Sequence, residues 1–157
     1  MNAGDDGFIV HLLQPRELNQ FPTGASPMTL EENKALVRRY FEEIGNQGNL
    51  TVVSEIVKAE AVADVQRLTT TLHIAFPDFH IVIEHQIAEG DLVATHFTAS
   101  GTHTGEWDSP FGKFAPTGKH FVHEGIRLFR VENSRLVDTW GGADTLDQLQ
   151  QLGIINM

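Results

Sequence analysis

The segment RLFRVENSRLVDTWGGADTLDQLQQLG, residues 127–153, decides the fold because it joins strands, a turn and a helix in a fixed order. Apolar and polar residues alternate on both sides of the short ENS turn, which predicts two antiparallel strands over 121–131 and 135–140. Gly141-Gly142 then breaks the alternation, and Asp144 is a good N-cap for a short helix. Three leucines of that helix are expected to face inward: Leu146, Leu149 and Leu152.

Three helices are predicted upstream, between residues 29 and 76. Thr29 and Glu32 form a capping box at the first, and Asn49 caps the second. The third begins near Glu60 and ends at the FPD sequence of 76–78, where proline stops a helix. The apolar residues of the first helix share one face: Leu36, Val37, Tyr40, Phe41 and Ile44.

The period of the pattern then changes from helical to two. Residues 79–88 alternate as a strand, with His85 predicted on the same face as Ile83, and 89–91 form a hairpin turn into the next strand. Residues 101–119 contain four glycines and two prolines and are predicted to be a long loop. Helices first, an antiparallel meander second and a closing helix predict an α+β fold.

The chain length of 157 residues fits one such domain, over 28–157. Residues 1–27 are expected to be an N-terminal extension or linker, since NQFPTGASP is rich in Pro, Gly and Ser. Alternatively, the apolar run FIVHLL at 8–13 adds an extra strand to the domain.

Composition excludes several function classes. Eleven Lys and Arg against 21 Asp and Glu leave a net charge of −10, which argues against nucleic-acid and anionic-membrane partners. The absence of cysteine excludes disulfides and thiolate chemistry, and no apolar run is long enough for a membrane span. The N-terminal apolar run is too short for a signal peptide, so a cytoplasmic protein is expected.

No metal and no cofactor are expected. The eight histidines show neither helical i, i+4 pairing nor an H-x-H spacing on one strand, and His120 and His123 fall on opposite faces. No P-loop, dinucleotide fingerprint or serine nucleophile elbow is present.

Several stretches together resemble the SnoaL-like polyketide cyclase family, whose members are often labelled ester cyclases, within the nuclear transport factor 2-like fold. They are ENKALVRRYFEEIGNQGNL (32–50), AFPDF (75–79), GTHTGEW (101–107), APTGK (115–119) and the opening segment. The resemblance covers roughly residues 29–153. It implies a cone-shaped curved antiparallel sheet packed on N-terminal helices around an apolar pocket, and a homodimer. Members with assigned chemistry close rings by intramolecular aldol condensation without metal or cofactor.

The resemblance also exposes a departure at the catalytic pair. Family enzymes use an Asp at the end of the last strand, helped by a His on the preceding strand. Those positions fall on Gly141 and Arg127 here. Glycine has no side chain and arginine stays protonated, so neither can play the family role.

Two residues nevertheless suggest catalysis. Alternation places His123 and Arg127 on one face of their strand, on either side of Gly125, and the resemblance points that face into the cone. We therefore predict an anion or enolate site, with Arg127 as fixed charge, His123 as proton carrier and Gly125 as a point of close ligand approach. Alternatively, Arg127 pairs with Asp138 or Asp144, and His123 is merely packed.

Further residues are predicted to contact the ligand, an apolar or aromatic small molecule. They are Trp107, Phe111, Phe121, Phe129, Trp140, Asp144 and His96. The aromatic residues of the 101–119 loop would cover the pocket as a lid, or alternatively form a satellite cluster under a long loop. Trp140 is expected to line either the pocket or a subunit interface.

Three functions remain open. The first is a SnoaL-like cyclase-type protein that acts on a carbonyl-bearing molecule through Arg127 and His123. The second is a non-catalytic small-molecule-binding module of the same fold. The third is a limonene-epoxide-hydrolase-like hydrolase, which needs an Asp–Arg–Asp constellation that Arg127, Asp138 and Asp144 would have to supply.

Overall fold

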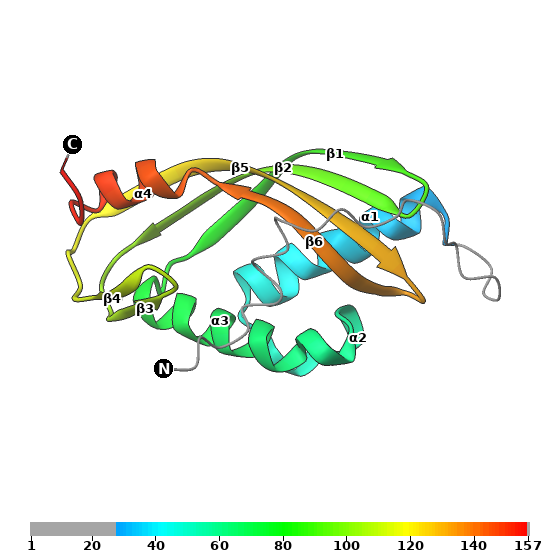
Figure 1. Cartoon of the computed structure of the whole chain (residues 1–157), viewed down its shortest axis with the longest axis horizontal. Helices are drawn as coiled ribbons and strands as arrows, with labels where there is room; N and C mark the ends of the chain where they lie inside the picture. Colours follow the sequence, from blue (N-terminus) through cyan, green and yellow to red (C-terminus); the bar gives the residue numbers. More distant parts are fainter. Residues whose placement is uncertain (1–27, 157) are drawn as a thin grey trace.

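A curved antiparallel sheet lies over a layer of helices in the computed structural model of the chain, which describes residues 28–156 (Figure 1). The predicted α+β class is confirmed. The predicted extra strand at 8–13 lies outside the described residues. Among the residues described, no helix is long and apolar enough to cross a membrane.

The helical layer begins with α1 (Leu30–Arg39), which continues as the π-helix η1 (Tyr40–Asn46). The predicted capping box is present: the backbone N–H of Thr29 donates to Glu32 Oε2 (2.7 Å) and that of Glu32 donates to Thr29 Oγ1 (3.2 Å). The predicted apolar face is buried except at Tyr40, which is half-buried, and Phe41 is only 3% exposed. A single regular helix was the expectation; the last two turns are instead π-helical.

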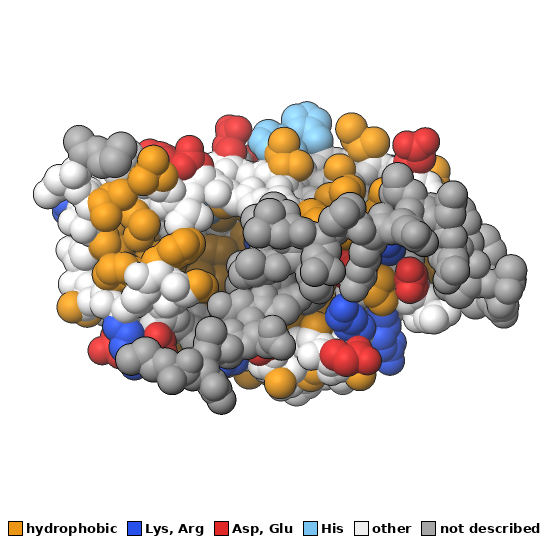
Figure 2. All heavy atoms as spheres, viewed as in Figure 1, with side chains coloured by type: hydrophobic (Ala, Val, Ile, Leu, Met, Phe, Trp, Pro, Cys, Tyr) orange, Lys and Arg blue, Asp and Glu red, His pale blue; other side chains and the backbone are white. Residues whose placement is uncertain are grey.

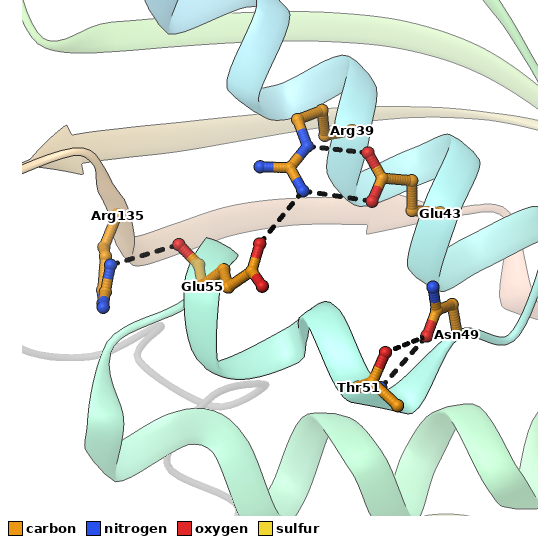
Figure 3. Close-up of polar contacts among 6 residues, drawn as sticks. All are labelled: Arg39, Glu43, Asn49, Thr51, Glu55 and Arg135. Atoms are coloured by element: carbon orange, nitrogen blue, oxygen red, sulfur yellow. Dashed lines mark hydrogen bonds and ion pairs between the residues drawn. The ribbon is translucent and has the colours of Figure 1, made fainter.

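Shorter helices connect this layer to the long helix α3 (Val62–Ala75). They are η2 (Leu50–Val52), α2 (Val53–Ile56) and η3 (Ala59–Ala61). As predicted, Asn49 caps the first of them: its Oδ1 accepts from the N–H (3.1 Å) and the hydroxyl (2.7 Å) of Thr51 (Figure 3). Arg39 joins helices of this layer, since it donates to Glu43 of η1 (2.7 Å) and to Glu55 of α2 (3.4 Å).

Four long strands form the sheet in the order β1-β2-β5-β6: β1 (His80–Glu89), β2 (Leu92–Thr102), β5 (His120–Glu132) and β6 (Arg135–Ala143). We call the face that packs on the helices the inner face and the opposite one the outer face. In β2 and β5 buried residues alternate with exposed or half-buried ones, as the period of two predicts.

A β-bulge reverses this alternation within β1. Ile83 pairs with Phe97, but the next paired residue, His85, already faces His96. His85 therefore lies on the outer face, and Ile87 is 72% exposed. The prediction that His85 shares a face with Ile83 is wrong, because the bulge inserts one extra residue into the strand.

The region expected to be a long loop is partly a strand and a hairpin. β2 continues to Thr102, and a small two-stranded sheet follows, made of β3 (Trp107–Ser109) and β4 (Gly112–Phe114). Trp107 is 8% exposed, and its ring lies 5.2 Å from that of Phe76, which anchors the hairpin on the end of α3.

Residues 127–153 also differ from the prediction, at Gly141 and Gly142. β6 does not end at Trp140 but continues through Gly141 and Gly142 to Ala143, which pairs with Gly125. Asp144 then caps α4 (Thr145–Gln151), as predicted, by accepting from the N–H of Asp147 (3.0 Å).

Helix α4 lies against β5, beyond the end of β6 (Figure 1). The side-chain amide of Gln151 donates to the carbonyl of Val122 and accepts from its N–H, both at 2.8 Å. Leu152, next to the C-terminal end of α4, is fully buried, whereas Leu146 is 50% exposed, so the predicted inward position of Leu146 is wrong.

Candidate functional site

His123 is a buried titratable group on the inner face of β5. Only 9% of it is exposed, and its Nδ1 has no hydrogen-bond partner among residues 28–156. Burial lowers the pKa of His123 below its usual 6.5, while the negative charges of Asp144 and Asp147 oppose that shift. The imidazole is therefore neutral near pH 7 and keeps one ring nitrogen free to accept a proton.

Arg127 is the cation of the inner face. It is half-buried, and within the described part of the chain its guanidinium makes no hydrogen bond or ion pair. The two carboxylates predicted as its partners are engaged elsewhere. Asp138 lies 3.8 Å from Lys58 Nζ and 3.9 Å from Arg130 Nη1, and Asp144 caps α4. The Asp–Arg–Asp constellation of an epoxide hydrolase is thus not assembled among the described residues.

An aromatic side chain separates His123 from Arg127. A Cβ built on Gly125 would lie 2.5 Å from Phe97 Cζ, so the ring of Phe97 already occupies the space above that glycine. Phe97 is 5% exposed and packs on Phe41, with ring centroids 5.3 Å apart. The prediction of close ligand approach at Gly125 is therefore wrong: the glycine accommodates Phe97.

Gly141, which the resemblance places at the position of the family acid, cannot carry a side chain in this backbone. Its φ is +92°, and a Cβ would lie 2.3 Å from the carbonyl oxygen of Ile126. L-residues rarely adopt that conformation, and no real Cβ approaches an oxygen so closely. The path of β6 thus excludes an Asp side chain at the position that the resemblance assigns to the family acid.

Small residues occupy the inner face of β6 in its C-terminal half. Thr139, Gly141 and Ala143 pair with Phe129, Arg127 and Gly125 of β5, respectively. The Oγ1 of Thr139 is buried and has no hydrogen-bond partner within residues 28–156. Sequence reasoning missed Thr139, although its alternation with Gly141 in β6 was a usable signal. Figure 2 shows a hollow with hydrophobic side chains at its walls on the face of the molecule that is drawn there.

The aromatic residues predicted to bind ligand are mostly part of the core. Phe121 and Phe129 lie on the inner face but are completely buried, and Trp107 packs in a cluster with Phe76 and Phe114. Phe111 is 63% exposed at the turn between β3 and β4. The core positions favour the satellite-cluster alternative for this hairpin over a lid.

Two further predicted contacts, His96 and Trp140, lie on the outer face. His96 Nε2 is 3.2 Å from Glu124 Oε2, and the Trp140 ring lies 5.4 Å from Arg130 Cζ. Since strand parity separates them from Arg127, they do not share a site with it. Among residues 28–156, no group of three His, Cys, Asp or Glu side chains is arranged to hold a metal ion.

A curved antiparallel sheet over N-terminal helices is the architecture of the nuclear transport factor 2-like fold. The sequence profile of the SnoaL-like polyketide cyclases matches residues 35–152, and the chain belongs to this family.

Solved structures agree with that assignment at the level of fold. A protein from Jannaschia sp. CCS1, described as a SnoaL-like polyketide cyclase, superposes with a TM-score of 0.71 at 18% identity, covering 85% of this chain and 100% of that one. A protein from Acidithiobacillus ferrooxidans, described as a polyketide cyclase, gives 0.66 at 23% identity, covering 82% and 100%. IdmH of Streptomyces antibioticus, also described as a polyketide cyclase, gives 0.61 at 25% identity, covering 77% and 98%. No curated protein sequence matches the chain significantly.

Proposed function

We propose that this protein is a cofactor-independent cyclase-type protein that binds an apolar, carbonyl-bearing small molecule on the inner face of its sheet. His123 accepts a proton from the carbon next to a carbonyl, and the electron pair of the broken C–H bond forms an enolate. The enolate carbon attacks a second carbonyl of the same molecule, forming a C–C bond and an alkoxide. The alkoxide then takes the proton back from the imidazolium. Arg127 binds a negatively charged oxygen of the ligand.

The state of His123 carries this proposal. A buried, neutral imidazole whose ring nitrogen has no hydrogen-bond partner can act as a base without first losing a hydrogen bond to water. Its conjugate acid would be stabilised by Asp144 and Asp147, whose charges already favour protonation. These carboxylates would take over the electrostatic part of the task of the absent family acid.

Deuterium exchange tests the base directly. The native protein is expected to accelerate α-proton exchange of aromatic β-keto esters in D2O above the rate in buffer alone, followed by NMR, and His123→Gln is expected to remove this acceleration. His80→Gln is the matched control, because His80 is exposed and lies on the outer face. Acceleration that persists in His123→Gln would refute the assignment of the base.

A second function, a non-catalytic binding module, is supported by Gly141. Since no acid can occupy that position, the proposed mechanism assigns proton delivery to the forming alkoxide to His123. Ligand binding without any exchange in the native protein would favour the binding module.

We also propose that the protein acts as a cytoplasmic homodimer that pairs through the outer face. Four aliphatic side chains are exposed on β1 and β5 of that face: Val82, Ile87, Val122 and Ile126. A second copy would cover this apolar surface.

A further inference from the structure

The charge of Arg127 lacks a counter-ion among the described residues. A guanidinium remains protonated at any pH that the protein meets, so burial cannot neutralise it. A half-buried charge without a partner costs free energy, and the two candidate carboxylates are used by other contacts. Within residues 28–156, the inner face therefore offers one positive charge without a counter-ion to an anion.

A second unsatisfied group lies beside it. Thr139 pairs with Phe129, and Gly141 pairs with Arg127, so Thr139 is the diagonal neighbour of Arg127 across β5 and β6. Diagonal neighbours lie about 7–8 Å apart, within reach of a long side chain. The buried Oγ1 of Thr139 has no partner within residues 28–156 and can donate its proton to the same anion.

The anion is not the reacting enolate. His123 and Arg127 are four residues apart on β5, about 13 Å along an extended strand. Phe97 stands between them above Gly125. An enolate oxygen lies only one carbon away from the proton that was removed, so an enolate formed at His123 stays on the His123 side of Phe97. The charge that Arg127 binds must belong to a different group of the ligand.

We propose that Arg127 and Thr139 form a carboxylate subsite, and that the ligand is an apolar carboxylic acid whose reactive carbonyl lies at the His123 end. This assignment rests on the proposed function for the position of the carbonyl, but the subsite itself does not. The body of the ligand passes beside Phe97 over Gly141 and Ala143, where β6 has almost no side-chain volume. A planar carboxylate matches the fork of the guanidinium, which a neutral ester cannot do.

Matched ligand pairs test the subsite. Isothermal titration calorimetry with 2-naphthoate, a longer aryl-alkanoate and their methyl esters is expected to show at least tenfold tighter binding of each acid. Arg127→Met keeps the length of the side chain, removes its charge and is expected to abolish that preference. Thr139→Val is isosteric and is expected to weaken acid binding about threefold, with ester binding unchanged.

Arg67→Met is the control for net charge, because Arg67 is exposed on α3 and pairs with Asp64 (3.7 Å). It is expected to retain the preference for acids. Equal affinity for acid and ester, no binding of either acid, or a preference that survives Arg127→Met would overturn the subsite. His123→Gln should bind the acids as the native protein does, so failure of the proposed catalysis would appear as absent exchange with intact acid binding.

Discussion

Gly141→Asp, the substitution that would restore the family acid, is expected to destabilise the protein without creating activity. The cost has two parts. Holding an L-residue at φ +92° destabilises the folded protein by about 1–3 kcal/mol. A Cβ would lie 2.3 Å from the Ile126 oxygen, and the backbone shift in β5 that removes this overlap costs about another 1–3 kcal/mol. Together they predict a loss of about 2–6 kcal/mol in the free energy of unfolding.

Urea denaturation followed by circular dichroism measures this loss. Gly141→Ala should show most of it, since strain and overlap arise at the Cβ and not at the carboxylate. Gly142→Asp is the matched control: a Cβ there has nothing within 4 Å, and its φ is not in the left-handed region. We expect a change below about 1 kcal/mol for this exposed site.

The reasoning would be refuted if Gly141→Asp and Gly142→Asp had equal stability. It would also be refuted if Gly141→Asp gained α-proton exchange with native stability. Either outcome would mean that β6 can accept a side chain at 141 and that the glycine is dispensable.

Two predictions concern pH and assembly. Burial lowers the folded-state pKa of His103 and His123 below the unfolded value near 6.5, so the stability from burying them neutral is complete above pH 6.5 and falls as pH drops toward the folded pKa values. The free energy of unfolding should therefore decrease more steeply below pH 6.5 in the native protein than in His103→Gln; parallel curves would contradict this. Ile126→Lys should convert the proposed homodimer to monomer in size-exclusion chromatography with light scattering, whereas Ile74→Lys, a substitution on α3, should not. A native protein that is already monomeric would refute the dimer.

Local signals predicted much of the fold. Three helix caps were predicted correctly: the capping box of Thr29 and Glu32 and the caps at Asn49 and Asp144. Each is a contact between residues at most three positions apart, so the local sequence is enough to predict it. The bulge in β1 was not predicted, because the pattern of one strand does not reveal an extra residue relative to its partner.

The site was only partly predictable for the same reason. Alternation correctly placed His123 and Arg127 on one face. The ring of Phe97 over Gly125 belongs to a neighbouring strand, and the clash at Gly141 comes from Ile126, so neither could be read from the residues beside them. Long-range packing decides whether a glycine opens space for a ligand or for another side chain.

The bidentate contact between Gln151 and Val122 has a consequence for association. An exposed strand edge is a template on which another chain can add a strand. β6 ends opposite Gly125, so the edge of β5 at Val122 would be free, yet both of its backbone groups are satisfied by a side-chain amide. Unlike a strand, a side-chain amide presents no further row of backbone hydrogen-bonding groups to another chain. Helix α4 therefore ends the sheet at this edge of β5. The side chain of Gln151 protects the edge from the addition of another strand.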